Sequence, residues 1–164
     1  MTNEEFAYLA GFLDGDGCIM LQLVRLRDYV CGYQIRASIV FYQKTSNAFF
    51  LDWLKAKLKH GYIRHRNDGM SEYTIVGTTT VLALIQKMYP YLRLKKRQAE
   101  LAKSVLEKMP TGGQKMSPVL LLELAKEVDT FAVLNYSKRR TNTSMQVKQF
   151  LLSRQLLNPV ETDS

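Results

Sequence analysis

The stretch that decides the fold lies near the amino terminus, at residues 9–17, and reads Leu-Ala-Gly-Phe-Leu-Asp-Gly-Asp-Gly. Upstream of it, Asn3 can cap a helix, and Glu4 and Glu5 fall in the first turn, where the helix dipole favours negative charge. Apolar side chains then recur at helical spacing as far as Leu13. The pattern predicts one helix that ends in an acidic turn containing glycine.

The end of this predicted helix is unusual because Asp14 and Asp16 put two carboxylates at the negative end of the dipole. Two interpretations remain open. A divalent cation would reverse the sign of the interaction, since carboxylate and carbonyl oxygens are the ligands that Mg²⁺ prefers. Alternatively, Gly15 and Gly17 end the helix in a Schellman-type cap, followed by a solvated Asp-Gly turn.

One face of the same helix carries only small residues, Ala7, Ala10 and Gly11, at positions i, i+3 and i+4. Small side chains at this spacing allow a second helix backbone to approach closely, for steric reasons that hold in water as well as in membranes. We therefore expect another helix to pack against this face.

Length and composition indicate a single globular domain. The chain has 164 residues, 46% of them hydrophobic and 23% charged, which is enough for a real core. No apolar run is long enough to span a bilayer, so no membrane partner is expected. Cys18 and Cys31 have no metal-like spacing and are expected to be free thiols, and two histidines are too few for a zinc site. The net charge of +8 favours a polyanionic partner, most simply nucleic acid.

The periodicity along the rest of the chain predicts two β-hairpins alternating with helices. The predicted strands are 18–27 and 33–43, then 62–66 and 71–76, the second pair joined by an Asp-Gly turn. The predicted helices are 45–60, with Thr45 or Ser46 as its cap and Gly61 as its stop, then 78–88, 92–109, 117–134 and 143–157. The result is an α+β fold, αββαββα, with an antiparallel sheet, helices on one face and extra C-terminal helices. We expect one domain over 1–157, its C-terminal helical part beginning near 111, and a polar tail over 158–164.

One face of the predicted sheet is a candidate for nucleic-acid binding. A β-ribbon fits the major groove, where arginine pairs with guanine and glutamine with adenine. An ordinary solvated sheet face is the alternative, and Met20, Val24, Leu26 and Val40 are less polar than a reading face would need. The outward residues with suitable chemistry are Gln22, Gln34, Arg36, Arg64 and Arg66.

The string at 9–17 resembles the signature of the LAGLIDADG homing endonucleases, and it departs from that signature only at Phe12, Leu13 and Gly15. The similarity is closest to the single-motif type, whose members work as homodimers, and it covers nearly the whole chain. Further matching segments in the same order are 43–45, 50–52, 61–64, 94–99 and 134–138. The resemblance implies a saddle-shaped sheet on DNA and a symmetric dimer interface on Ala7, Ala10, Gly11 and Asp14.

The resemblance also implies roles for the residues around the acidic turn. Asp16 and the carbonyl of Gly15 would bind a divalent metal, Mg²⁺ or else Mn²⁺ or another cation, while Asp14 is structural. Gln43 would orient a water molecule, although a polar residue at a helix entry is an equal alternative. Lys95 would stabilise charge on the scissile phosphate, and its alternative is a solvated helix lysine. Asn47 stands where a basic residue is common in the family.

Further DNA contacts come from the same resemblance. Matching positions on the sheet are Tyr29, Ser38, Tyr62, Glu72 and Thr74. The basic run Lys138, Arg139 and Arg140 is expected to clamp phosphates.

The leading hypothesis is a homodimeric, Mg²⁺-dependent endonuclease that cuts both strands of a long, roughly palindromic DNA site. One chain carries one Asp16, and two cuts need two reaction centres, so two copies are expected to meet about a two-fold axis. The alternatives are an intron RNA maturase and a DNA-binding regulator that does not cut. The resemblance implies an organellar protein, with the chloroplast as the first expectation and the mitochondrion as the second.

Overall fold

The computed structural model describes residues 1–135 and 140–158, and its elements follow the predicted αββαββα order. The first half comprises α1 (Asn3–Asp16), β1 (Gly17–Arg25), β2 (Tyr33–Lys44), α2 (Phe49–Leu58), β3 (Tyr62–His65), β4 (Met70–Val76) and α3 (Thr78–Met88). The second half comprises α4 (Lys96–Lys108), α5 (Pro118–Asp129), α6 (Phe131–Leu134) and α7 (Ser144–Ser153). Within these described residues, no helix combines the length and the apolar character needed to cross a membrane.

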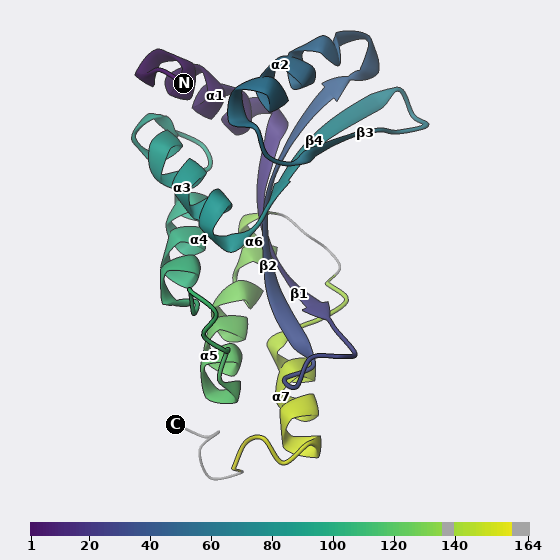
Figure 1. Cartoon of the computed structure of the whole chain (residues 1–164), viewed down its shortest axis with the longest axis vertical. Helices are drawn as coiled ribbons and strands as arrows, with labels where there is room; N and C mark the ends of the chain where they lie inside the picture. Colours follow the sequence, from purple (N-terminus) through teal and green to yellow (C-terminus); the bar gives the residue numbers. More distant parts are fainter. Residues whose placement is uncertain (136–139, 159–164) are drawn as a thin grey trace.

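The four strands form one antiparallel sheet in the order β1-β2-β4-β3. The long strand β2 is shared: its first part pairs with β1, where Gly17 lies opposite Phe41, and its last part pairs with β4, where Ser38 lies opposite Val76. Figure 1 shows this long twisted sheet with α3, α4 and α5 along one side of it. The α+β fold predicted from the sequence is confirmed.

The core lies between the helices and one face of the sheet. Alternate residues of the strands, such as Ile19, Ile39 and Tyr73, are fully buried there. Burial of each such side chain stabilises the fold by about 1.5–3 kcal/mol relative to exposure. The same hydrophobic cluster extends from Leu9 in α1 to Leu157 beyond α7, so the C-terminal helices share the core of the first half.

The start of α1 differs from the prediction. Thr2, and not Asn3, is the N-cap: its hydroxyl accepts the Glu5 N–H at 3.2 Å, and the Glu5 carboxylate accepts the Thr2 N–H at 2.9 Å. This reciprocal capping box satisfies two helix-end donors, which a cap at Asn3 would leave without those partners.

The acidic segment also differs from the Schellman alternative, because α1 continues helically through Gly15 to Asp16 and passes directly into β1. Gly17 is extended, with φ of −133°. A Cβ on Gly17 would lie 2.5 Å from the Leu13 Cδ1 atom, so this glycine is needed for the close approach of strand to helix.

Three predicted helices are shorter than expected, and one of them, predicted over 143–157, forms α7 only over Ser144–Ser153. The segment 45–60 begins with a single 3₁₀ turn, and the Thr45 hydroxyl pairs with Ser71 at 2.9 Å instead of capping α2. Helix α2 ends at Leu58, and its C-cap Lys59 has φ of 60°, two residues before the predicted stop. The predicted helix 92–109 begins only at Lys96, because the N–H groups of the three residues before it donate to the Asp14 carboxylate of α1. The predicted helix 117–134 is divided at Thr130 into α5 and α6.

Candidate nucleic-acid interface and active site

The strand register puts the predicted reading residues of the sheet on one face. Gln22 pairs with Arg36, Arg64 with Glu72, and Tyr62 with Thr74, and the Thr74 position also lies opposite Val40. Cross-strand partners share a face, and residues two apart along a strand do too. The sheet therefore gathers eight of the predicted DNA-binding residues on its helix-free face: Gln22, Gln34, Arg36, Ser38, Tyr62, Arg64, Glu72 and Thr74.

This reading face is not uniformly accessible. Gln22, Tyr62 and Arg64 are exposed, whereas Ser38 and Thr74 are only 1% and 6% exposed. The hydroxyl of Ser38 is buried and has no hydrogen-bond partner among the described residues. Ser38 and Thr74 thus lie in the floor of the face, and the polar chemistry offered to a ligand comes from its flanks.

An ionic chain organises one flank of the reading face. Arg64 Nε lies 2.8 Å from one oxygen of Glu72, and an Arg66 nitrogen lies 3.9 Å from the other. Arg66 also pairs with Asp68 at 2.5 Å. Exposed pairs of this kind are worth about 0–1 kcal/mol, so a phosphate or a base edge can compete for both arginines. Glu72 therefore lies between the two guanidinium groups and pairs most closely with Arg64.

The two aspartates at the end of α1 have different surroundings. Asp14 is only 9% exposed, and its carboxylate accepts the backbone N–H groups of Arg93, Leu94 and Lys95 at 2.7, 3.2 and 2.9 Å. Both oxygens of the Asp14 carboxylate are therefore hydrogen-bonded to the backbone segment just before α4. Asp16, by contrast, is exposed. Asp14 therefore joins α1 to α4, and Asp16 is the carboxylate that is open to a ligand.

Lys95 lies beside this acidic segment. Its Nζ atom donates to the main-chain oxygen of Asp14 at 2.7 Å, where the positive charge meets the negative end of the α1 dipole. Burial raises the pKa of the Cys18 thiol at the start of β1, and the positive charge of Lys95 partly offsets that rise. The predicted catalytic lysine is thus fixed against the C-terminal end of α1.

Gln43 lies at the same end of the sheet. Because Gly17 pairs with Phe41, Asp16 just before it and Gln43 two residues after Phe41 both fall at the end of the β1–β2 ladder. Gln43 is half-buried, and its side-chain oxygen accepts the Lys44 N–H at 2.9 Å. Asp16, Gln43 and Lys95 therefore converge on one region, at the junction of α1 and the sheet.

The donor set of this region fits a hard divalent cation only in part. Asp16 supplies an exposed carboxylate and Gly15 a carbonyl at a helix end, and no basic residue lies in the last turn of α1. Among the described residues, however, no group of three acidic, histidine or cysteine side chains could hold a metal. A cation here would need further oxygen ligands from outside the chain.

The predicted dimer face of α1 is divided by the fold. Ala10 is fully buried and Asp14 nearly so, hence both belong to the chain's own interior. Ala7 is half-buried and Gly11 is exposed, with open space within 4 Å of its ideal Cβ. Together with Tyr8, which is 58% exposed, these two residues form the accessible strip of α1. The sequence signal for this strip was the set of small residues Ala7, Ala10 and Gly11, of which the fold leaves Ala7 and Gly11 accessible.

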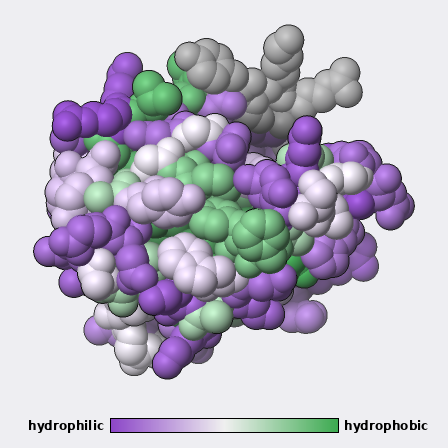
Figure 2. Space-filling model, turned by 90° about the horizontal axis from the view of Figure 1, so that it is seen from above, coloured by the Kyte–Doolittle hydropathy of each residue, from purple (hydrophilic) through white to green (hydrophobic). Residues whose placement is uncertain are grey.

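An aromatic patch adjoins this strip. Figure 2 shows a hydrophobic area on the end of the molecule where α1 and α2 lie. Tyr8 packs edge-on to Phe50 with ring centroids 5.9 Å apart, and Phe50 stacks on Trp53 at 5.7 Å. Phe49, in the same helix as Trp53, is exposed. The strip and the patch form a mostly apolar surface made by α1 and α2.

Three further predicted DNA-binding residues, Tyr29, Arg66 and Arg140, lie outside the strands of the sheet. Tyr29 is exposed in the β1–β2 loop, and Arg66 follows β3. Arg140 is mostly buried and bonded to main-chain carbonyls, which differs from the predicted phosphate clamp. Lys138 and Arg139 lie outside the described residues, as do residues 159–164 of the predicted tail. Asn135 lies in the matching segment 134–138, but the sequence assigned no role to it or to Asn142, and the amides of both bind β1.

Comparisons with known proteins show the family of the chain. The family model for the LAGLIDADG endonuclease matches residues 9–104. The chain is 40% identical over 147 residues to the DNA endonuclease I-CvuI of Chlorella vulgaris, covering 90% of this chain and 89% of the relative. It is 37% identical over 150 residues to the DNA endonuclease I-CreI of Chlamydomonas reinhardtii, covering 91% and 90%.

Solved structures show the same likeness. A crystal structure of I-CvuI in complex with its target, in the presence of calcium, superimposes with a TM-score of 0.87 at 37% identity, covering 95% of this chain and 98% of that one. A DNA complex of the archaeal intron-encoded endonuclease I-Vdi141I gives a TM-score of 0.79 at 17% identity, covering 94% and 99%, which supports the fold alone. From the matched family model and two relatives above one-third identity, the chain belongs to the LAGLIDADG endonuclease family.

Proposed function

We propose that the protein is a homing endonuclease that binds a long, roughly palindromic DNA site as a homodimer and hydrolyses one phosphodiester bond in each strand. The observation that supports this proposal most strongly is the convergence of Asp16, Gln43 and Lys95 beside a sheet face rich in arginine and glutamine. The candidate catalytic groups then lie at one end of the same sheet that carries the reading groups.

The dimer follows from the number of reaction centres. One chain offers a single Asp16, and a double-strand cut needs two. The accessible strip of α1, with the aromatic patch of α2 beside it, gives a second copy an apolar surface on which to pack. Packing of two copies about a two-fold axis brings both acidic helix ends close to that axis. It also completes a ligand set that one described chain lacks.

We assign Asp16 and the Gly15 carbonyl to a divalent cation, Mg²⁺ first and Mn²⁺ or another cation as alternatives. When bound, such a cation lowers the pKa of water and offsets the charge of the attacking and leaving oxygens. Lys95, fixed by its bond to the Asp14 oxygen, directs its ammonium group at the charge that grows on the scissile phosphate. Gln43 holds the attacking water by its amide.

The sheet supplies the sequence specificity in this proposal. Arg36, Arg64 and Arg66 suit guanine, while Gln22 and Gln34 suit adenine, in a major groove wide enough for a β-ribbon. Tyr29, Tyr62, Glu72 and the floor residues Ser38 and Thr74 complete the reading face. Lys138 and Arg139, outside the described residues, are assigned to phosphates. The contacts of Arg140 favour another role.

We also propose an organellar location, the chloroplast first and the mitochondrion second. The support is that both relatives above one-third identity come from algae, Chlorella vulgaris and Chlamydomonas reinhardtii. Immunolocalisation in the source cell tests this assignment.

The proposed activity is tested by selecting a target from a randomised DNA library and then measuring linearisation of a plasmid that carries it. Cleavage is expected with Mg²⁺ and is expected to stop when a chelator removes the cation. Asp16→Asn should bind the target without cutting it, whereas Glu123→Gln, the same change at an exposed carboxylate on α5, should cut normally. Tight binding without cleavage by the unmodified protein would instead favour the regulator, and splicing of an intron RNA would favour the maturase.

A further inference from the structure

The open edge of β1 is held by side chains. Because β1 is the terminal strand of the sheet, every second residue has its N–H and C=O directed away from β2. Three successive carbonyls on that edge each accept a side-chain N–H: Ile19 from Asn135 at 2.9 Å, Leu21 from Arg140 at 2.8 Å, and Leu23 from Asn142 at 2.9 Å. We call Asn135, Arg140 and Asn142 the edge clamp.

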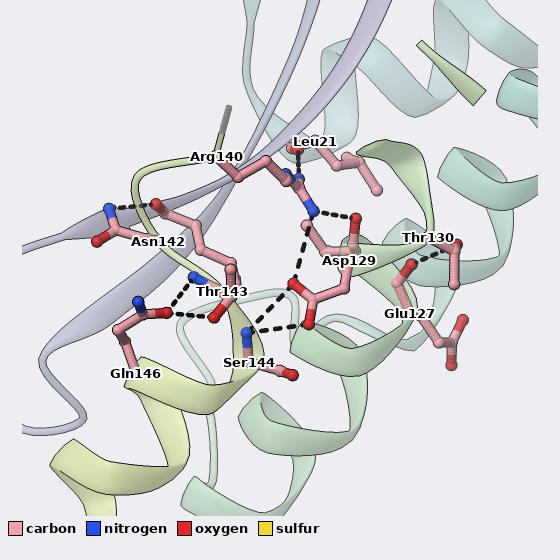
Figure 3. Close-up of polar contacts among 11 residues, drawn as sticks. Leu21, Glu127, Asp129, Thr130, Arg140, Asn142, Thr143, Ser144 and Gln146 are labelled. Carbon is pink, nitrogen blue, oxygen red and sulfur yellow. Dashed lines mark hydrogen bonds and ion pairs between the residues drawn. The ribbon is translucent and has the colours of Figure 1, made fainter. Parts of the chain in front are cut away.

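Arg140 is anchored on its other side to the end of α5. Its Nη1 atom donates to the Val128 oxygen at 2.6 Å and lies 3.6 Å from the Asp129 carboxylate. Figure 3 shows the Arg140 side chain between Asp129 and Leu21. The side chain is only 16% exposed. The guanidinium fork thus connects two main-chain carbonyls, one in α5 and one in β1, and this is a geometry that a lysine could not reproduce.

Asp129 extends the anchor to α7. Its two carboxylate oxygens accept the Ser144 N–H at 3.2 and 3.1 Å, at the first turn of that helix. The first turn of α7 is further fixed by Thr143 and Gln146, which form a capping box. The edge clamp is therefore mounted on a rigid frame made by the end of α5 and the start of α7.

The far end of the β1–β2 hairpin is held by the same C-terminal region. The Arg25 guanidinium lies 4.2 Å from the ring centroid of Phe150 in α7 and 5.2 Å from that of Tyr33. Tyr33 and Phe150 pack edge-to-face at 5.9 Å. The edge clamp and this aromatic contact together support β1 over most of its length.

We propose that Asn135, Arg140 and Asn142 are positioning residues for DNA recognition, and that they set where the outward side chains of β1 lie. Met20 and Gln22 alternate with the three clamped carbonyls, and Val24 follows the last of them. Their side chains point to the reading face. Bidentate base recognition tolerates only small displacements, so a fixed strand backbone sharpens discrimination. This inference rests on the proposed function, because it concerns how the sheet reads DNA.

The competing role for Arg140 is the phosphate clamp that the sequence suggested. Arg140→Lys separates the two roles, because it keeps the charge and removes the fork. A phosphate clamp tolerates lysine and leaves base preference unchanged, whereas the edge clamp does not. Arg140→Gln gives the converse comparison: loss of a phosphate contact reduces the slope of log K against log salt by about one, and loss of the edge clamp leaves the slope unchanged.

The test measures cleavage of targets with every single base substitution, at a temperature well below each variant's Tm. Gln22→Ala and Arg64→Ala first define the base pairs read from β1 and from β3. Asn142→Leu and Arg140→Lys should then relax discrimination about fivefold or more at the β1 base pairs, and leave the β3 base pairs unchanged. Asn158→Leu, at an exposed asparagine of the same region, is the matched control.

The outcomes distinguish the inference from the function. If Gln22→Ala and Arg64→Ala each relax their own base pairs while the edge-clamp variants lower only Tm, or relax all positions equally, the positioning role is overturned and the proposed function stands. If Gln22→Ala and Arg64→Ala leave every base preference unchanged, the proposal that side chains of the sheet recognise the bases is wrong. Should Arg140→Lys fold poorly, Asn142→Ser and Asn135→Ser provide the same comparison with smaller changes.

Discussion

The ammonium group of Lys95 donates a hydrogen bond to the main-chain oxygen of Asp14, 2.7 Å away, while the Asp14 carboxylate accepts the backbone N–H of Lys95 at 2.9 Å. This reciprocal pair fixes the end of α1 to the residue before α4. A lysine assigned to charge stabilisation is thereby held without using the exposed carboxylate of Asp16. Asp14 and Asp16, separated by one residue, thus have different roles: Asp14 is structural, and Asp16 is open to a ligand.

Asp14→Asn should therefore destabilise the fold. An amide offers one acceptor oxygen, and its NH₂ group would oppose the donors of Arg93, Leu94 or Lys95. Hydrogen bonds to a charged group contribute about 1.5–3 kcal/mol each, so we expect the unfolding free energy to fall by at least that amount. Denaturant titration measures it. An unchanged unfolding midpoint would mean that water accepts the hydrogen bonds of the three N–H groups in the variant.

Asp16→Asn should have the opposite effect on stability. The change removes a carboxylate from the negative end of α1, where it costs about 0.3–1 kcal/mol. In metal-free solution we expect an equal or slightly higher Tm. With Mg²⁺ present we expect cleavage to be abolished and DNA affinity to be retained. Calorimetry, a cleavage assay and a binding titration on this one variant give the three values. Retained cleavage at the usual Mg²⁺ concentration would refute the metal-binding role.

Gly11→Leu should separate folding from assembly. The ideal Cβ of Gly11 meets nothing within 4 Å in the single chain, so the monomer accommodates leucine. At a close helix–helix contact the same side chain overpacks the interface, at a cost of about 1–3 kcal/mol or more. Sedimentation equilibrium should show a weakened dimer of a protein that still folds. Ala10→Leu, one residue away in the core, should instead lower the stability of the chain itself.

Glu72→Gln should raise affinity and lower specificity. It frees Arg64 and Arg66 from a carboxylate that lies 2.8 and 3.9 Å away and removes a negative charge from the reading face. Non-specific DNA binding should strengthen, and its salt dependence should steepen, because more positive charge reaches phosphates. Stability should change by no more than about 1 kcal/mol. Fluorescence anisotropy over a series of salt concentrations tests the prediction, and an unchanged affinity for random DNA would contradict it.

Tyr73 should make the fold sensitive to alkaline pH. Burial raises the pKa of the Tyr73 phenol to about 12, and its O–H donates to the His60 oxygen. The raised pKa contributes stability that is fully present below pH 10 and is lost as pH rises towards 12, at about 1.4 kcal/mol per pH unit. Unfolding free energies measured across this window should show the loss. Tyr73→Phe should lack this component and serves as the control.

The sequence by itself determined the order of elements and the residues that share a face. Alternation in residues 33–43 and the Asp-Gly turn at Asp68–Gly69 are local signals, since a strand's period and a turn's backbone depend on near neighbours. The residues predicted to face outward share one face of the sheet for the same reason, because cross-strand pairing follows from that alternation. The family resemblance added the roles of Asp16, Gln43 and Lys95, which periodicity cannot supply.

Only the tertiary structure decided which of several similar side chains is exposed. Asp14 and Asp16 are alike in sequence, but the first binds N–H groups 79 to 81 residues away. Arg140 belongs to a basic run typical of phosphate binding, yet its guanidinium binds a carbonyl 119 residues away in β1. Ala10 and Gly11 are both small, but Ala10 is buried in the core whereas Gly11 is exposed. Such contacts join segments that are remote in the chain, and their energies depend on a packed geometry that no local pattern contains.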